Sequence, residues 1–125
     1  MKISYDDFKK AEIRAGKILS AEKIPDTDKL LALTVDLGDM KETPHEAGRM
    51  TKLEPAPRSI VSGIAAHFPD PSVLVGRTCM FVANLEPRTI RGRVSDGMIF
   101  ALSTGSGEFS LLEPDDAIPP GTLAG

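Results

Sequence analysis

The sequence has little aromatic and sulfur chemistry. Its 125 residues include no tryptophan, one tyrosine, five phenylalanines and one cysteine. The hydrophobic core must therefore be built from aliphatic side chains, and aromatic rings supply little energy for stacking on a base. The lone Cys79 excludes an internal disulfide and a zinc site with several cysteine ligands, and it suits a reducing compartment.

Long apolar runs and targeting segments are absent as well. No hydrophobic run approaches the roughly 18 residues of a membrane span. The N-terminal sequence MKISYDDFKK does not resemble a signal peptide. We therefore predict a cytoplasmic protein with no membrane partner. A chain of 125 residues also fits one domain, residues 1–125.

Net positive charge is absent too. The formal charge of −3 argues against nucleic acid, because affinity for a phosphate backbone comes from clustered lysine and arginine. The charges are unevenly distributed, however: residues 58–104 carry five arginines and three acidic residues, whereas residues 105–125 carry four acids and no base. An anion-binding surface must therefore be local. On charge alone, an ordinary acidic surface is the favoured interpretation.

The hydrophobic pattern predicts a small β protein. Alternation with a period of two is clearest over residues 31–37, which indicates a half-buried strand. Ser4 predicts a short capped helix, and Pro71 predicts a helical turn that Gly76 stops. Further strands are expected over residues 12–22, 58–64, 78–85, 94–102 and 109–112, with a bulge or a tight bend at Gly16 and at Gly97. This order fits an all-β fold, a five-stranded OB-fold barrel with short helices and an extended C-terminal segment, although periodicity leaves other small barrels open.

Residues 39–57 show no period and contain three prolines, which predicts a long loop insertion. Its Glu42, His45 and Glu46 are conceivable metal ligands, but a solvated loop is the favoured interpretation. Neither a glycine-rich phosphate loop nor a nucleophile elbow is present. Cys79 lies in an apolar run, where packing is more common than catalysis. We therefore predict no enzymatic activity, no metal and no cofactor.

Four segments carry a likeness to a known family. They are DF at 7–8 with IRAGKI at 13–18; PDTDKLL at 25–31 with VDLG at 35–38; RSIVSGI at 58–64; and VANLEP at 82–87 with RG at 91–92 and SDGMI at 95–99. Together they resemble the tRNA-binding domain of methionyl-tRNA synthetase C-termini, free-standing tRNA-binding proteins and the secretion chaperone CsaA. The resemblance implies an OB-fold, a homodimer and recognition of tRNA by shape.

The resemblance also implies a set of RNA-contact residues. They are Arg14, Lys17, Asn84, Arg91, Ser95 and Met98, to which the loop position of Arg88 and Arg93 adds two candidates for phosphate contact. Arg14 and Lys17 are three apart in a strand and point to opposite faces unless Gly16 forms a bulge. Three of the others have a structural alternative: a turn for Asn84, a capped bend for Ser95, and core packing, which is favoured, for Met98.

Three functions fit these observations. The first is a structure-specific tRNA-binding protein, acting in trans or as a helper of an aminoacyl-tRNA synthetase. The second is a CsaA-type chaperone that binds unfolded or exported polypeptides. The third is a structural module that dimerises and docks onto another protein. The apolar residues of the segment 111–123 are candidates for a dimer interface.

Overall fold

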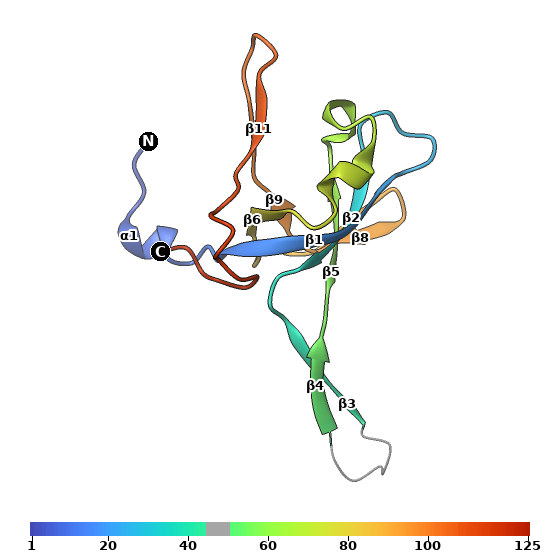
Figure 1. Cartoon of the computed structure of the whole chain (residues 1–125). Helices are drawn as coiled ribbons and strands as arrows, with labels where there is room; N and C mark the ends of the chain where they lie inside the picture. Colours follow the sequence, from blue (N-terminus) through green and yellow to red (C-terminus); the bar gives the residue numbers. More distant parts are fainter. Residues whose placement is uncertain (45–50) are drawn as a thin grey trace.

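The structure is a computed structural model that describes residues 1–44 and 51–125 of the chain (Figure 1). Strands dominate, with one short α-helix and two 3-10 helices in the described residues. In chain order the elements are α1 (Tyr5–Phe8), β1 (Ile13–Lys23), β2 (Leu31–Asp36), β3 (Met40–Pro44), β4 (Thr51–Pro55), β5 (Arg58–Ser62), η1 (Ala65–His67), η2 (Pro71–Leu74), β6 (Thr78–Val82), β7 (Arg88–Ile90), β8 (Arg93–Ser95), β9 (Met98–Ile99), β10 (Ala101–Ser103) and β11 (Phe109–Leu111).

Five of these strands form one antiparallel sheet that nearly closes into a barrel. Its strand order is β5-β2-β1-β6-β9. The two edges approach each other where the backbone N–H of Asp96 donates to the carbonyl of Ser59 at 2.8 Å. This arrangement confirms the predicted all-β, OB-like fold.

The core is aliphatic, as the composition requires. Strand β2 alternates buried and half-buried positions along its whole length, which confirms the period-two prediction. The largest fully buried side chain is that of Phe81 on β6. Cys79 is fully buried beside it in the same strand, and this burial raises the pKa of its thiol to about 11. The thiol therefore packs and stays protonated at neutral pH.

Gly16 serves close packing and not a bulge, so the bulge prediction is wrong. Strand β1 pairs with β6 without interruption from Ile13 to Lys17, and the register shift against β2 lies later, between Ile18 and Ser20. A Cβ at position 16 would lie 2.6 Å from a side-chain carbon of Leu37, inside the barrel. The glycine is therefore required because two core side chains occupy the space of a side chain.

Two hairpins project from the barrel as arms (Figure 1). One is formed by β3 and β4, which pair from Met40–Pro55 to Pro44–Thr51. The prediction of an irregular loop over residues 39–57 is therefore wrong for the paired residues, while His45 and Glu46 lie outside the described residues. The other arm is formed by β10 and β11 and the turn between them, where the backbone N–H of Gly107 donates to the carbonyl of Thr104.

The short helices follow their predicted signals. The Ser4 hydroxyl accepts a hydrogen bond from the backbone N–H of Asp7 at 3.0 Å and so caps α1. Pro71 begins η2, where the Asp70 side chain caps the turn. In the described residues, no helix has the length and apolarity that crossing a membrane requires.

Candidate nucleic-acid interface

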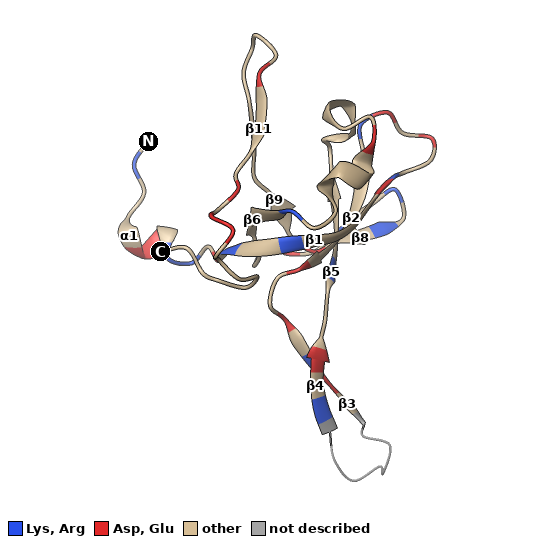
Figure 2. Ribbon diagram, in the orientation of Figure 1, with Lys and Arg blue, Asp and Glu red and all other residues tan. Residues whose placement is uncertain are grey.

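A basic hairpin stands beside the barrel where the sequence predicted a loop followed by the start of a strand. Residues 88–95 fold into β7 and β8, joined by a turn in which Arg91 and Gly92 both have positive φ, 52° and 76°. Two positive φ values are typical of the tight turns whose twist matches a hairpin. The predicted strand over 94–102 is broken at Gly97, whose φ is 134°. Figure 2 shows basic residues along this hairpin.

The pairing of the hairpin decides which side chains share a face. Arg88 lies opposite Ser95, and Ile90 lies opposite Arg93. Because residues paired across two strands project to the same side, Arg88 and Arg93 share a face with Ser95. Ser95 is buried against β5, so this face is turned toward the barrel and Arg91 extends at the tip.

The hairpin holds the arginines that are free to bind an anion. Arg88, Arg91 and Arg93 are all exposed and form no ion pair within residues 1–44 and 51–125. The other arginines of that part, by contrast, are each bound to a carboxylate. They are Arg14, Arg58 and Arg77. Only an unpaired guanidinium can exchange its counterions for phosphate without breaking a native contact.

A groove of about 340 Å³ lies between this hairpin and the outer face of the sheet. Its floor consists of two rungs, each a row of three paired residues that runs across strands β1, β2 and β5. Its far wall is formed by two residues of the hairpin. The first rung is Ser20, Thr34 and Ser59, the second is Glu22, Ala32 and Val61, and the wall is Arg93 and Val94. OB-folds bind oligonucleotides on this face and on the loop that joins their last two strands.

A second, more apolar cavity adjoins the hairpin. Its volume is about 520 Å³, and it is lined by Val61, Leu85 and Met98 together with Glu86 and Arg88. The Met98 side chain is 46% exposed, so the prediction that it packs in the core is wrong. Val61 lines both cavities.

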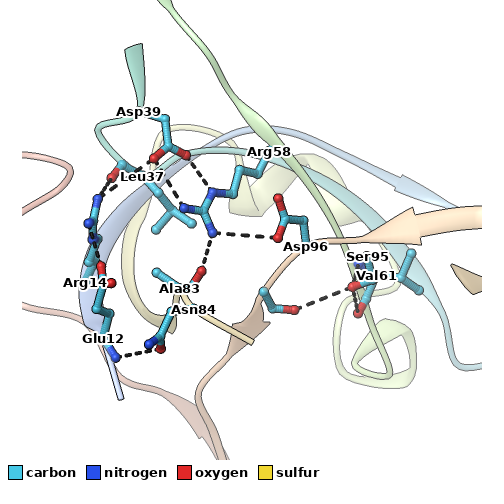
Figure 3. A network of polar contacts seen from close by, with 11 residues as sticks. Glu12, Arg14, Leu37, Asp39, Arg58, Val61, Ala83, Asn84, Ser95 and Asp96 are labelled. Carbon is cyan, nitrogen blue, oxygen red and sulfur yellow. Dashed lines mark hydrogen bonds and ion pairs between the residues drawn. The ribbon is translucent and has the colours of Figure 1, made fainter. Parts of the chain in front are cut away.

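Below the hairpin, Arg58 is the centre of a polar network (Figure 3). Its Nε donates to Asp39 Oδ2 at 2.5 Å and its Nη2 donates to Asp39 Oδ1 at 3.2 Å, a two-pronged pair. Nη1 donates to the carbonyl of Ala83 and lies 3.8 Å from a carboxylate oxygen of Asp96. The hydrogen bond from Arg58 holds the pKa of Asp39 below its ordinary value, against an opposing effect of burial.

Arg14 belongs to the same network. Its Nη2 donates to Glu12 at 2.6 Å, and its Nη1 lies 3.5 Å from the carbonyl of Leu37 and 3.9 Å from Asp39 (Figure 3). Its side chain is only 24% exposed. The charge of Arg14 is therefore largely neutralised inside the fold, although the resemblance places it among the RNA contacts.

Asn84 and Ser95 have structural partners that the sequence did not reveal. The Asn84 side chain accepts from the backbone N–H of Glu12 at 2.7 Å and donates to the carbonyl of Lys10, tying the N-terminal segment to the end of β6. The Ser95 hydroxyl accepts from the backbone N–H of Val61 at 2.9 Å, which joins β8 to β5. Their role in RNA contact remains a prediction.

Lys17 lies apart from the other predicted contacts. Without a bulge at Gly16, it projects to the opposite side of β1 from Arg14. It lines a separate cavity beside Arg77 and Glu113. The structure therefore gathers Arg88, Arg91, Arg93, Ser95 and Met98 on one side, places Arg14 and Asn84 in the adjoining network, and leaves Lys17 elsewhere.

Sequence reasoning missed the floor of the groove. Thr34 alternates with apolar residues in β2, and this alternation was the available signal for one of the three hydroxyls, whereas Ser20 and Ser59 lie in strands without a clear period. Which of these polar residues meet depends on the strand register, which the sequence pattern did not supply.

The fold and this surface define an OB-like domain with a basic hairpin beside the groove on the outer face of its sheet. The chain belongs to the family described as "Putative tRNA binding domain", whose model matches residues 13–123.

Solved structures agree with this assignment. The chain is 32% identical to the MetRS related protein from Pyrococcus horikoshii, with a TM-score of 0.80 over 99% of both chains. It is 22% identical to the chaperone CsaA from Bacillus anthracis, with a TM-score of 0.75 over 100% of both chains. It is 23% identical to the CsaA chaperone protein from Picrophilus torridus, with a TM-score of 0.74 over 99% of this chain and 100% of that one. At the two lower identities the likeness concerns the fold.

Proposed function

We propose that this protein binds tRNA without catalysing a reaction, acting in trans or as a helper of an aminoacyl-tRNA synthetase. The observation that carries the proposal is the set of three arginines on the hairpin that form no ion pair within the described residues, of which Arg93 lines the groove and Arg88 lines the adjoining cavity. Membership in the tRNA binding domain family supports the choice of ligand.

The local charge explains how a chain with a net charge of −3 binds a polyanion. The arginines of the hairpin lie within a few residues of one another, and no carboxylate of the described residues pairs with them. Two carboxylates next to the hairpin, Asp39 and Asp96, are occupied by Arg58, whereas Glu22 lines the groove itself. With few aromatic residues for stacking, recognition depends on the phosphate backbone and on the shape of the RNA.

Binding of unfractionated tRNA at a series of salt concentrations tests this proposal. We expect affinity to fall steeply with salt, because each phosphate contact releases counterions. A filter-binding measurement with double-stranded DNA of similar length is the control for unspecific attraction to a polyanion. If tRNA does not bind at low salt, or binds no better than the DNA, the proposed function is wrong.

A second candidate is the binding of unfolded polypeptides. The apolar cavity around Leu85 and Met98 is the observation that favours it, because both side chains are nearly half exposed and can cover an apolar side chain of a peptide. Apolar contacts respond little to moderate salt, whereas phosphate contacts respond strongly. Binding of a reduced, unfolded model protein that survives high salt would favour this candidate over RNA.

We also propose that the protein forms a homodimer. Helix α1 buries no residue, and its Tyr5 and Phe8 are 72% and 45% exposed. The end of the chain lies close by, since Ala124 bonds to Ile13, and Leu123 is 60% exposed. Leu111, expected at an interface, packs instead in the core of its own chain.

Multi-angle light scattering tests the dimer. Substituting both aromatic residues of α1 by serine is expected to convert a dimer into a folded monomer. A wild-type protein that scatters as a monomer at high concentration would rule the dimer out.

A further inference from the structure

The groove beside the hairpin has a floor without bulky side chains. Its two rungs present hydroxyls from Ser20, Thr34 and Ser59 and small apolar groups from Ala32 and Val61. A planar ring can lie flat on such a floor. The volume of about 340 Å³ falls within the range of small-ligand sites, roughly 300–1,000 Å³.

The two walls of the groove carry opposite charges. Glu22 lies at the β1 side, and Arg93 lies beyond β5 on the hairpin. Neighbouring strands are roughly 4.8 Å apart, so the floor from β1 to β5 is about 10 Å wide. This width accommodates one nucleotide placed across the strands, with its phosphate at the arginine and its base toward the carboxylate.

Glu22 is exposed and free to accept hydrogen bonds. In the part of the chain that the structure describes, it forms no ion pair and no side-chain hydrogen bond. An ionised carboxylate has two acceptor oxygens and no donor. It therefore selects a partner that presents two donors side by side.

Among the four bases of RNA, guanine alone meets this requirement at its Watson–Crick edge. Its N1–H and its 2-amino group are adjacent donors, whereas adenine, cytosine and uracil each place an acceptor next to their donor. A carboxylate repels such an acceptor. In a duplex this edge of guanine is already paired, so the carboxylate reaches it only when the nucleotide is unpaired.

We propose that this groove binds an unpaired guanine nucleotide, with Glu22 accepting from N1–H and the 2-amino group and Arg93 contacting the phosphate. The proposal rests on the RNA-binding function proposed above and adds a base preference to it. It also gives a use to the acidic side chain that lines the groove.

Fluorescence anisotropy with labelled pentaribonucleotides tests the proposal. The probes are UUGUU, UUAUU and UUIUU, in which inosine keeps N1–H but lacks the 2-amino group. We expect UUGUU to bind about 10-fold tighter than UUAUU, with UUIUU between them, as for other two-pronged contacts to a base. In Glu22→Gln the preference should fall below about 3-fold, because the amide offers only one acceptor oxygen.

Two variants serve as controls. Glu42→Gln removes the same charge from β3, outside the groove, and should keep the guanine preference. Arg93→Ala should weaken all three pentamers alike and leave the preference unchanged. Equal binding of the three probes to the wild type, no binding of any probe, or an unaltered preference in Glu22→Gln would each overturn the proposal.

Binding of unfractionated tRNA, measured on the same preparations, separates this proposal from the function on which it rests. If tRNA binds and the pentamers show no base preference, only the guanine site is wrong. If tRNA fails to bind, the proposed function is wrong, whatever the pentamers show.

Discussion

The contrast between free and paired arginines leads to a prediction for RNA binding. In the triple variant Arg88→Ala, Arg91→Ala and Arg93→Ala, three guanidinium groups are lost that have no ion-pair partner in the described part of the chain. Each phosphate contact contributes about 0.7–0.9 to the slope of log K against log salt. Loss of three contacts should therefore reduce the slope by about 2–3 and weaken tRNA binding near 0.1 M salt by roughly 100-fold.

The same variant should leave stability nearly unchanged. All three side chains are exposed, and substitutions at such surface positions usually change the free energy of unfolding by less than about 0.5 kcal/mol. The assay is filter binding of tRNA at four or more salt concentrations, together with urea denaturation of each variant. Both measurements are needed, because a loss of binding through unfolding would otherwise imitate a loss of contacts.

Arg14→Ala is the matched comparison, since it removes a charge that the fold already neutralises. It should lower the free energy of unfolding by about 1–2 kcal/mol, through lost hydrogen bonds to Glu12 and Leu37, and change the salt slope little. If the triple variant kept the wild-type salt slope while Arg14→Ala reduced it, the phosphate-binding surface would lie at the network and not at the hairpin.

Three further predictions concern the fold around the site. Arg58→Ala should destabilise the protein by about 2–4 kcal/mol at pH 7, because it leaves Asp39 without its partner. The lowered pKa of Asp39 makes this contribution complete above its ordinary pKa of 3.8, so the difference between wild type and variant in urea denaturation should shrink as the pH falls below that value. Gly16→Ala should cost at least about 2 kcal/mol, since the new methyl would overlap two core side chains, and thermal unfolding of a variant as stable as the wild type would contradict this. Ser95→Ala should cost about 1–2 kcal/mol by leaving the N–H of Val61 unpaired, and hydrogen exchange at that amide should accelerate if the hydroxyl is its partner.

Burial determined which strands were recognisable from the sequence. Strand β2 has one face in the core, so its alternation was visible, and the predicted strand over 58–64 contained β5 for the same reason. The hairpins β3–β4 and β7–β8 show no such alternation. Their pairing partners lie next to them in the chain, but nothing in the hydrophobic pattern marks the register; the first hairpin was predicted as a loop, and the second as a loop followed by the start of a strand.

The sequence predicted which residue types form the candidate site better than it predicted how these residues are arranged in space. The sequence identified the group of arginines around residue 91 and the likeness to tRNA-binding domains. It did not show that Asn84 bonds to Glu12, 72 positions away, or that Ser95 bonds to Val61, 34 positions away. Such partners depend on how distant strands approach each other, and a side chain alone carries no information about that approach.

The sequence by itself determined the aliphatic core, the order of the main strands and the family, because these follow from composition, local periodicity and short motifs. Only the tertiary structure decided which arginines are available to a ligand. Arg14, Arg58 and Arg77 meet carboxylates across the fold, whereas Arg88, Arg91 and Arg93 extend from a hairpin that brings no described carboxylate within ion-pair distance. The physical reason is that a charge becomes free or paired through contacts in space, and those contacts exist only once the barrel has closed.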